Sequence, residues 1–102
     1  MAEQLSPLNV AILAVPEVTA SALYGMVDLF SSPGRDFRFI TQGMAGDQRM
    51  RPYVVARDAD RFRAANGVWV HPDHTFADCP CPDIVCIPDF YVNPGDSVAG
   101  KV

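Results

Sequence analysis

Residues 9–30 read NVAILAVPEVTASALYGMVDLF. The first seven, 9–15, form a nearly continuous apolar run, which is typical of a strand covered on both faces in a parallel sheet. Pro16 ends this run, and Thr19 offers a hydroxyl that can cap a helix. From 20 to 30 the apolar residues recur at helical spacing. The segment therefore predicts a strand, a short loop and a helix, which is the beginning of an α/β fold.

The rest of the chain predicts further short strands. Phe37–Thr41 reads FRFIT and alternates, so we expect a second strand, parallel to the first and joined to it by a right-handed crossover. Tyr53–Ala56 predicts a third strand. Asn66-Gly67 is a hairpin-type turn signal, and Val68–Val70 after it predicts a strand that faces 53–56 or extends the sheet edge. Asp83–Pro88 reads DIVCIP, the pattern of another buried parallel strand.

Helices are few beside these strands. A parallel sheet needs helices on both faces, and one long helix cannot cover two faces. We therefore expect a single α/β domain that is incomplete at its C-terminal end. A strand and a sheet face without cover favour a chain that is marginally stable or self-associating by itself.

Composition excludes several classes of function. The 102 residues carry 8 Lys and Arg against 12 Asp and Glu, a net charge of −4, which argues against a general basic surface for nucleic acid. No apolar run reaches the roughly 18 residues of a membrane helix, and residues 1–7 hold no basic side chain for a secretory signal. We expect a cytoplasmic protein without a membrane partner. Dinucleotide, P-loop and serine-hydrolase motifs are missing, so no cofactor is predicted.

Histidines and cysteines suggest metal or redox chemistry only weakly. His71-Pro-Asp-His74 lacks the paired spacing of zinc sites, so we interpret it as a surface loop and predict no metal. Cys79-Pro-Cys81 and Cys86 do not form the C-x-x-C redox motif. We expect reduced cysteines with structural roles, and a reactive role, if there is one, falls to Cys79 or Cys81.

A ligand pocket is predicted where two strands end. Pro16 and Glu17 follow the first strand, and Asp89 and Phe90 follow the strand in DIVCIP. Ligand groups in parallel α/β folds gather at the carboxyl ends of strands, although each of these residues can also be an ordinary loop residue.

Five arginines predict a solvated surface or, alternatively, an anion or dimer contact: Arg49, Arg51, Arg57, Arg61 and Arg63.

Several segments in order resemble a known family. They are NVAILAVPEVTASALYGMVDLF, GRDFRFITQG and NGVWVHPDHTFADCPCPDIVCIPDF. Together they resemble the ThiJ/PfpI superfamily, which has the class I glutamine amidotransferase-like fold. Within it, the chain is most similar to the N-terminal sensor domain of GlxA-like AraC-type transcriptional regulators. The resemblance implies a flavodoxin-like α/β/α sandwich with a mostly parallel sheet, of which residues 1–102 are the N-terminal part of a single domain.

The chain departs from this family at the positions used for catalysis. The family's nucleophilic cysteine lies in a later Ala-Cys turn, and Cys79, Cys81 and Cys86 do not match it. Relatives with hydrolase activity place a glutamate near the start of the first helix, where this chain has residues 19–22, and Glu17 comes a few positions early. A Gly-Gly pair is replaced by Asp89-Phe90. No catalytic residue is therefore assigned, and these differences favour a protein that is not an enzyme.

The resemblance implies a ligand-sensing regulatory domain that takes an unknown small molecule. DNA would be contacted only by a helix-turn-helix domain outside these residues, and a homodimer is expected. An alternative is the N-terminal part of a cysteine-dependent amidase, protease-like enzyme or isocyanide hydratase, in which a thiolate attacks the substrate carbon. A third is a structural protein stabilised by oligomerisation.

Overall fold

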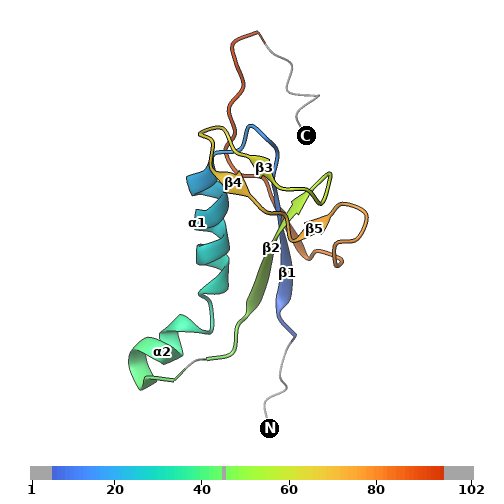
Figure 1. Ribbon diagram of the computed structural model, residues 1–102. Coiled ribbons are helices and arrows are strands. Elements are labelled where there is room, and N and C mark those ends of the chain that lie inside the picture. Colours follow the sequence, from blue (N-terminus) through green and yellow to red (C-terminus); the bar gives the residue numbers. More distant parts are fainter. Residues whose placement is uncertain (1–5, 45, 96–102) are drawn as a thin grey trace.

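A four-stranded parallel sheet forms the centre of the computed structural model, which describes residues 6–44 and 46–95. The strands lie in the order β5-β2-β1-β6. A separate hairpin pairs β3 with β4 (Figure 1). The strands are β1 (Leu8–Leu13), β2 (Met50–Ala56), β3 (Phe62–Arg63), β4 (Trp69–Val70), β5 (His74–Thr75) and β6 (Ile84–Cys86). The helices are α1 (Ala20–Ser31) and α2 (Asp36–Gln42).

The parallel register confirms the predicted α/β class. β1 pairs with β2 from Leu8↔Met50 to Leu13↔Val55, and it pairs on its other side with β6. The connection from β1 to β2 contains α1 and α2, and α1 packs along one face of the sheet (Figure 1). Among the described residues, no helix is long and apolar enough to cross a membrane.

The main core lies between α1 and the sheet. Leu23 is the one fully buried residue of α1, and it joins Val10, Ile12 and Val54 in one apolar cluster. Full burial of such a side chain contributes about 1.5–3 kcal/mol. The apolar spacing therefore predicted the buried face of this helix correctly.

The opposite face of the sheet is covered by a loop. Ala11, Tyr53 and Val55 form a second buried cluster, against which Cys79 packs. β6 was expected to be a fully buried strand, and its place beside β1 is confirmed, but Val85 is 62% exposed. Burial was overestimated because no described residue pairs with the outer edge of β6 or shields Val85.

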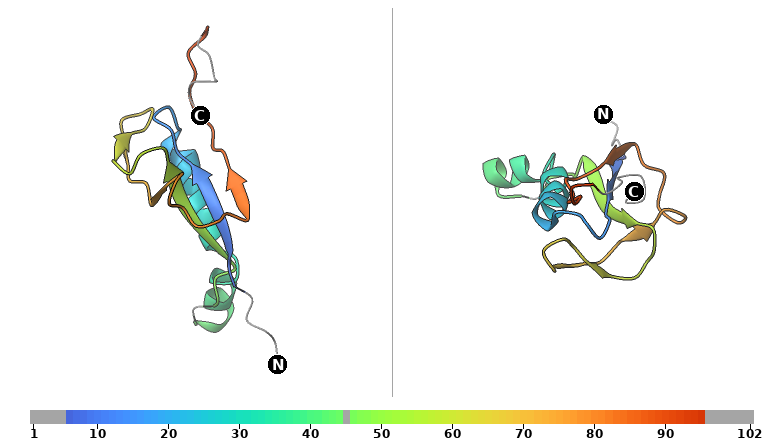
Figure 2. Two further views of the ribbon diagram at one scale, coloured as in Figure 1. Left: turned by 90° about the vertical axis from the view of Figure 1, so that its right-hand side faces the viewer. Right: turned by 90° about the horizontal axis from the view of Figure 1, so that it is seen from above.

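The segment FRFIT is helical, so the predicted second strand at Phe37–Thr41 is wrong. The N–H of Asp36 bonds to the carbonyl of Ser32, and Gly43 ends α2 in a left-handed conformation (φ +67°), with its N–H on the Phe39 carbonyl. Five alternating residues do not distinguish a strand from a short helix. α2 projects beyond the end of the sheet, where none of the described strands lies beside it (Figure 2).

The partner of β1 is instead β2, the segment expected to be the third strand. Val68–Val70 does not join the main sheet; its last two residues form β4, which pairs antiparallel with β3. The predicted Asn66-Gly67 turn is confirmed, because Gly67 adopts φ +85° and donates to the Ala64 carbonyl. The edge position beside β2 is taken by β5, which begins in the predicted surface loop.

Candidate ligand-binding site

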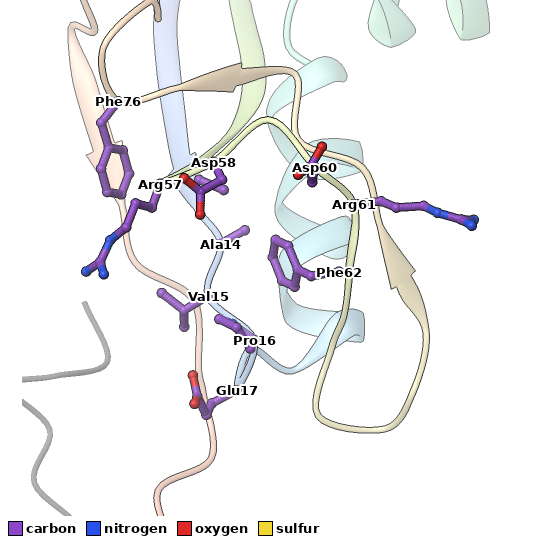
Figure 3. Close-up of a pocket in the computed structure, with 11 residues that line it drawn as sticks. Ala14, Val15, Pro16, Glu17, Arg57, Asp58, Asp60, Arg61, Phe62 and Phe76 are labelled. Carbon is purple, nitrogen blue, oxygen red and sulfur yellow. The ribbon is translucent and has the colours of Figure 1, made fainter.

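A pocket of about 430 Å³ opens at the carboxyl edge of the sheet (Figure 3). Its walls come from the residues after β1, the residues after β2, the arm that leads into β3, and one residue after β5. They are Ala14, Val15, Pro16, Glu17, Ala56, Arg57, Asp58, Asp60, Arg61, Phe62 and Phe76. This edge is where parallel α/β sheets place their ligands.

The arm that closes one side of the pocket is anchored by the hairpin. Ala64 and Val70 are buried in the main core, and the N–H of Ala65 bonds to the carbonyl of Val18 at 3.1 Å. The hydroxyl of Tyr24 on α1 donates to the Trp69 carbonyl at 3.3 Å. These contacts hold the hairpin against the β1–α1 loop. Phe62, which belongs to this hairpin, is thereby fixed in the wall of the pocket.

The pocket combines an apolar floor with a charged rim. Ala14, Val15 and Phe62 form the floor, and the side chains of Arg57 and Arg61 extend away from it (Figure 3). The guanidinium of Arg61 lies 4.1 Å from the centre of the Trp69 ring, and that of Arg63 lies 4.6 Å from it. Such cation–π contacts hold these two arginines on the hairpin surface.

Two of the four predicted site residues line the pocket. Pro16 and Glu17 belong to its wall, whereas Asp89 and Phe90 do not. Asp89 instead supports the β1–α1 loop: its carbonyl accepts from the N–H of Thr19 at 2.9 Å, and its carboxylate accepts from the Thr19 hydroxyl at 3.3 Å. Thr19 is the N-cap residue of α1, but its hydroxyl makes this contact and does not cap the helix.

The segment after β6 nevertheless lies beside the loop after β1. Phe90 forms an isolated bridge with Val18 and packs against the main core, and the N–H of Tyr91 donates to the Glu17 carbonyl at 2.8 Å. The four predicted residues thus come from two adjacent segments. Only the first of these segments, after β1, lines the pocket. The second, after β6, is bonded to the first and supports it.

Sequence reasoning missed most of the pocket wall. Arg57 and Arg61 were predicted to lie on a solvated surface or in an anion or dimer contact, and both line the pocket. Arg57 and Asp58 directly follow β2, so the rule that selected Pro16 and Glu17 could have assigned them to the pocket. Phe62 and Phe76 carry no such signal, because their position depends on how the hairpin and the β5 segment fold over the sheet.

None of the histidine and cysteine side chains lines this pocket. His74 makes an edge-to-face contact with Tyr53, with ring centroids 5.3 Å apart, and its Nδ1 is 3.9 Å from the Asp78 carboxylate. All three cysteines are free thiols. Within residues 6–44 and 46–95, no group of three or more His, Cys, Asp or Glu side chains is placed to hold a metal ion.

Solved structures with a similar fold include one that covers most of this chain. It is that of a ThiJ/PfpI family protein from Pseudomonas syringae, with a TM-score of 0.62 and 22% sequence identity, over 84% of this chain and 30% of the other. The chain thus spans less than a third of the length of this neighbour, and the likeness establishes the α/β fold. No protein-family model matches the chain, and no curated protein matches it either.

Proposed function

We propose that this chain is part of a ligand-sensing, regulatory domain with a ThiJ/PfpI-like fold in an AraC-type transcriptional regulator. A small molecule binds at the carboxyl edge of the sheet, between the end of β1 and the arm before β3. The main support for this proposal is the pocket of about 430 Å³ at this edge of the sheet.

The pocket suits a small organic ligand. Its volume falls in the range of roughly 300–1,000 Å³ that is typical of small-molecule sites. An apolar floor favours burial of an apolar ligand body, and the acidic residues of the wall, Glu17, Asp58 and Asp60, supply contacts for its polar end. The lining residues include no thiol, hydroxyl or imidazole, so the wall offers binding groups and no thiol nucleophile.

The environment of Asp89 supports a regulatory domain over the hydrolase alternative. An oxyanion site needs backbone N–H groups that point to a substrate. Here the Asp89 carbonyl and carboxylate both accept from Thr19, and the N–H of Tyr91 bonds to the Glu17 carbonyl. These groups brace the loop after β1. DNA contact belongs, in this proposal, to a helix-turn-helix domain outside the 102 residues, consistent with the net charge of −4.

Amide NMR spectra of the ¹⁵N-labelled protein test the binding site. The probes are fragment-sized aromatic amines, aromatic carboxylates and neutral aromatics. Binding should shift the amides of residues 14, 15, 17, 56–62 and 76. Phe76 is 47% exposed, so a ligand that covers the rest of the ring gains about 1 kcal/mol, and Phe76→Ala should weaken binding about fivefold.

Phe37→Ala is the matched control, because Phe37 is 77% exposed on α2, away from the pocket. It should leave probe affinity unchanged. Shifts that gather on α2, or equal losses in both variants, would show that the pocket is not the binding site. Conversion of a probe to a hydrolysed or hydrated product would favour the enzyme alternative.

A further inference from the structure

The loop over the second face of the sheet carries two cysteines separated by one proline. Cys79 is half-buried and packs against Ala11, Tyr53 and Val55, whereas Cys81 is exposed. Both are free thiols. The pair lies outside the proposed ligand pocket, so this inference goes beyond the proposed function.

Three different elements hold this short turn. The N–H of Cys79 donates to the Thr75 carbonyl at 3.0 Å, and the hydroxyl of Tyr53 donates to the Pro80 carbonyl at 2.6 Å. The side-chain amide of Asn9 donates to the Cys81 carbonyl at 3.2 Å. Each residue of the turn is therefore hydrogen-bonded to a strand of the sheet, which fixes the backbone positions of the two cysteines relative to each other.

The separation of the cysteines suits a disulfide. Residues two apart in a chain have Cα atoms at most about 7 Å from each other, and disulfides span about 4.4–6.8 Å between Cα atoms. Burial raises the pKa of Tyr53, and the negative charge of the Cys79 and Cys81 thiolates raises it further. Both cysteines thus lie within electrostatic reach of the same phenol.

We propose that Cys79 and Cys81 are an oxidation site that forms a reversible disulfide with a hydroperoxide as oxidant. The exposed Cys81, as thiolate, attacks the terminal peroxide oxygen; the O–O bond breaks, and the leaving oxygen takes up a proton to form water or an alcohol. The thiolate of Cys79 then attacks the Cys81 sulfenic acid. The S–S bond forms, the S–O bond breaks, and hydroxide leaves and is protonated to water. The dithiol loses two electrons, and the peroxide gains them.

The reaction changes the contacts of the loop. The thiol of Cys79 now points to the Phe76 carbonyl, with 3.8 Å between sulfur and oxygen, and its side chain covers the apolar cluster of Ala11 and Val55. Bond formation draws this sulfur toward Cys81, so the contact with Phe76 is lost. The amide signals of Phe76 and Cys79 should therefore report oxidation.

The test is to treat the protein with a small excess of hydrogen peroxide. The free thiols are then counted, and non-reduced peptides are analysed by mass spectrometry. Two of the three thiols should disappear, the mass should fall by about 2 Da, and dithiothreitol should restore both. The Cys79–Cys81 bond should lie within one peptide. Cys86→Ser is the matched control and should oxidise at the wild-type rate with the same loss of mass.

Cys79→Ser and Cys81→Ser should each abolish the fall of about 2 Da. Cys79→Ser should leave a sulfenic or sulfinic acid on Cys81, whereas Cys81→Ser removes the thiolate that attacks the peroxide and should leave Cys79 as a thiol. Three result patterns would overturn the proposal. They are persistence of all three thiols, a disulfide that includes Cys86, or an unchanged loss of mass in Cys81→Ser.

Discussion

Tyr53→Phe tests how the second face of the sheet is held. Tyr53 is 5% exposed, and its hydroxyl reaches across from β2 to the Pro80 carbonyl at 2.6 Å. Phenylalanine keeps the ring and its contact with His74 and removes only the hydroxyl. The variant therefore isolates one hydrogen bond between the sheet and the loop that covers it.

The expected loss of stability near neutral pH is about 1 kcal/mol, the net value of one such hydrogen bond. Pro80 is exposed, so water can solvate its carbonyl once the hydroxyl is gone, which keeps the loss from rising further. For a chain of this size, 1 kcal/mol corresponds to a fall of roughly 4–8 °C in Tm.

Alkaline pH provides a second readout. Burial raises the pKa of Tyr53 in the folded protein above its ordinary value of 10.0, with smaller contributions from Cys79, Cys81 and Asp83. The unfolded chain therefore releases the phenolic proton first. The stability that depends on the neutral phenol is complete below pH 10 and is lost as the pH rises toward the folded pKa. Tyr53→Phe removes this part of the alkaline loss.

Urea unfolding at pH 8 and pH 11, followed by circular dichroism with a reductant present, measures both effects. The difference between wild type and Tyr53→Phe should be about 1 kcal/mol at pH 8 and smaller at pH 11. Tyr91→Phe is the control, because Tyr91 is 62% exposed, and it should change neither value. Equal effects of the two variants, or a difference that does not vary with pH, would refute the reasoning.

Two further predictions concern the core and the assembly. Leu23→Ala should lower the free energy of unfolding, measured with urea, by about 3 kcal/mol. Leu29→Ala on the same helix is the control, because Leu29 is 64% exposed, and it should lower this value by less than about 0.5 kcal/mol. Similar losses in the two variants would mean that α1 does not pack as described. Val85 is 62% exposed on β6, so we expect the chain to self-associate and to show an apparent mass in sedimentation above the 11.1 kDa of the monomer. Val85→Lys should lower this apparent mass, whereas the control Val68→Lys should not. A wild-type monomer at all concentrations would contradict this expectation.

Elements with a strong apolar pattern were predictable. The predicted strand at 9–15 overlaps β1, and the one at 83–88 contains β6. The helical spacing over 20–30 correctly predicted α1, whose buried residue is Leu23. FRFIT was mistaken for a strand, because five residues carry too little periodic signal and the missing strand partner is visible only in three dimensions. The hairpin turn at Asn66-Gly67 was predictable because a turn with positive φ favours glycine.

The sequence by itself determined the class of this protein: parallel strands joined through a helix, with Pro16 and Glu17 at the end of the first strand. Tertiary structure decided which residues share the pocket, because Phe62 and Phe76 reach it only when the hairpin and the β5 segment fold over the carboxyl edge. It also assigned Asp89 to bracing Thr19. The difference has a physical reason: periodicity reports which face of one element is buried, whereas a site depends on contacts between elements far apart in the chain.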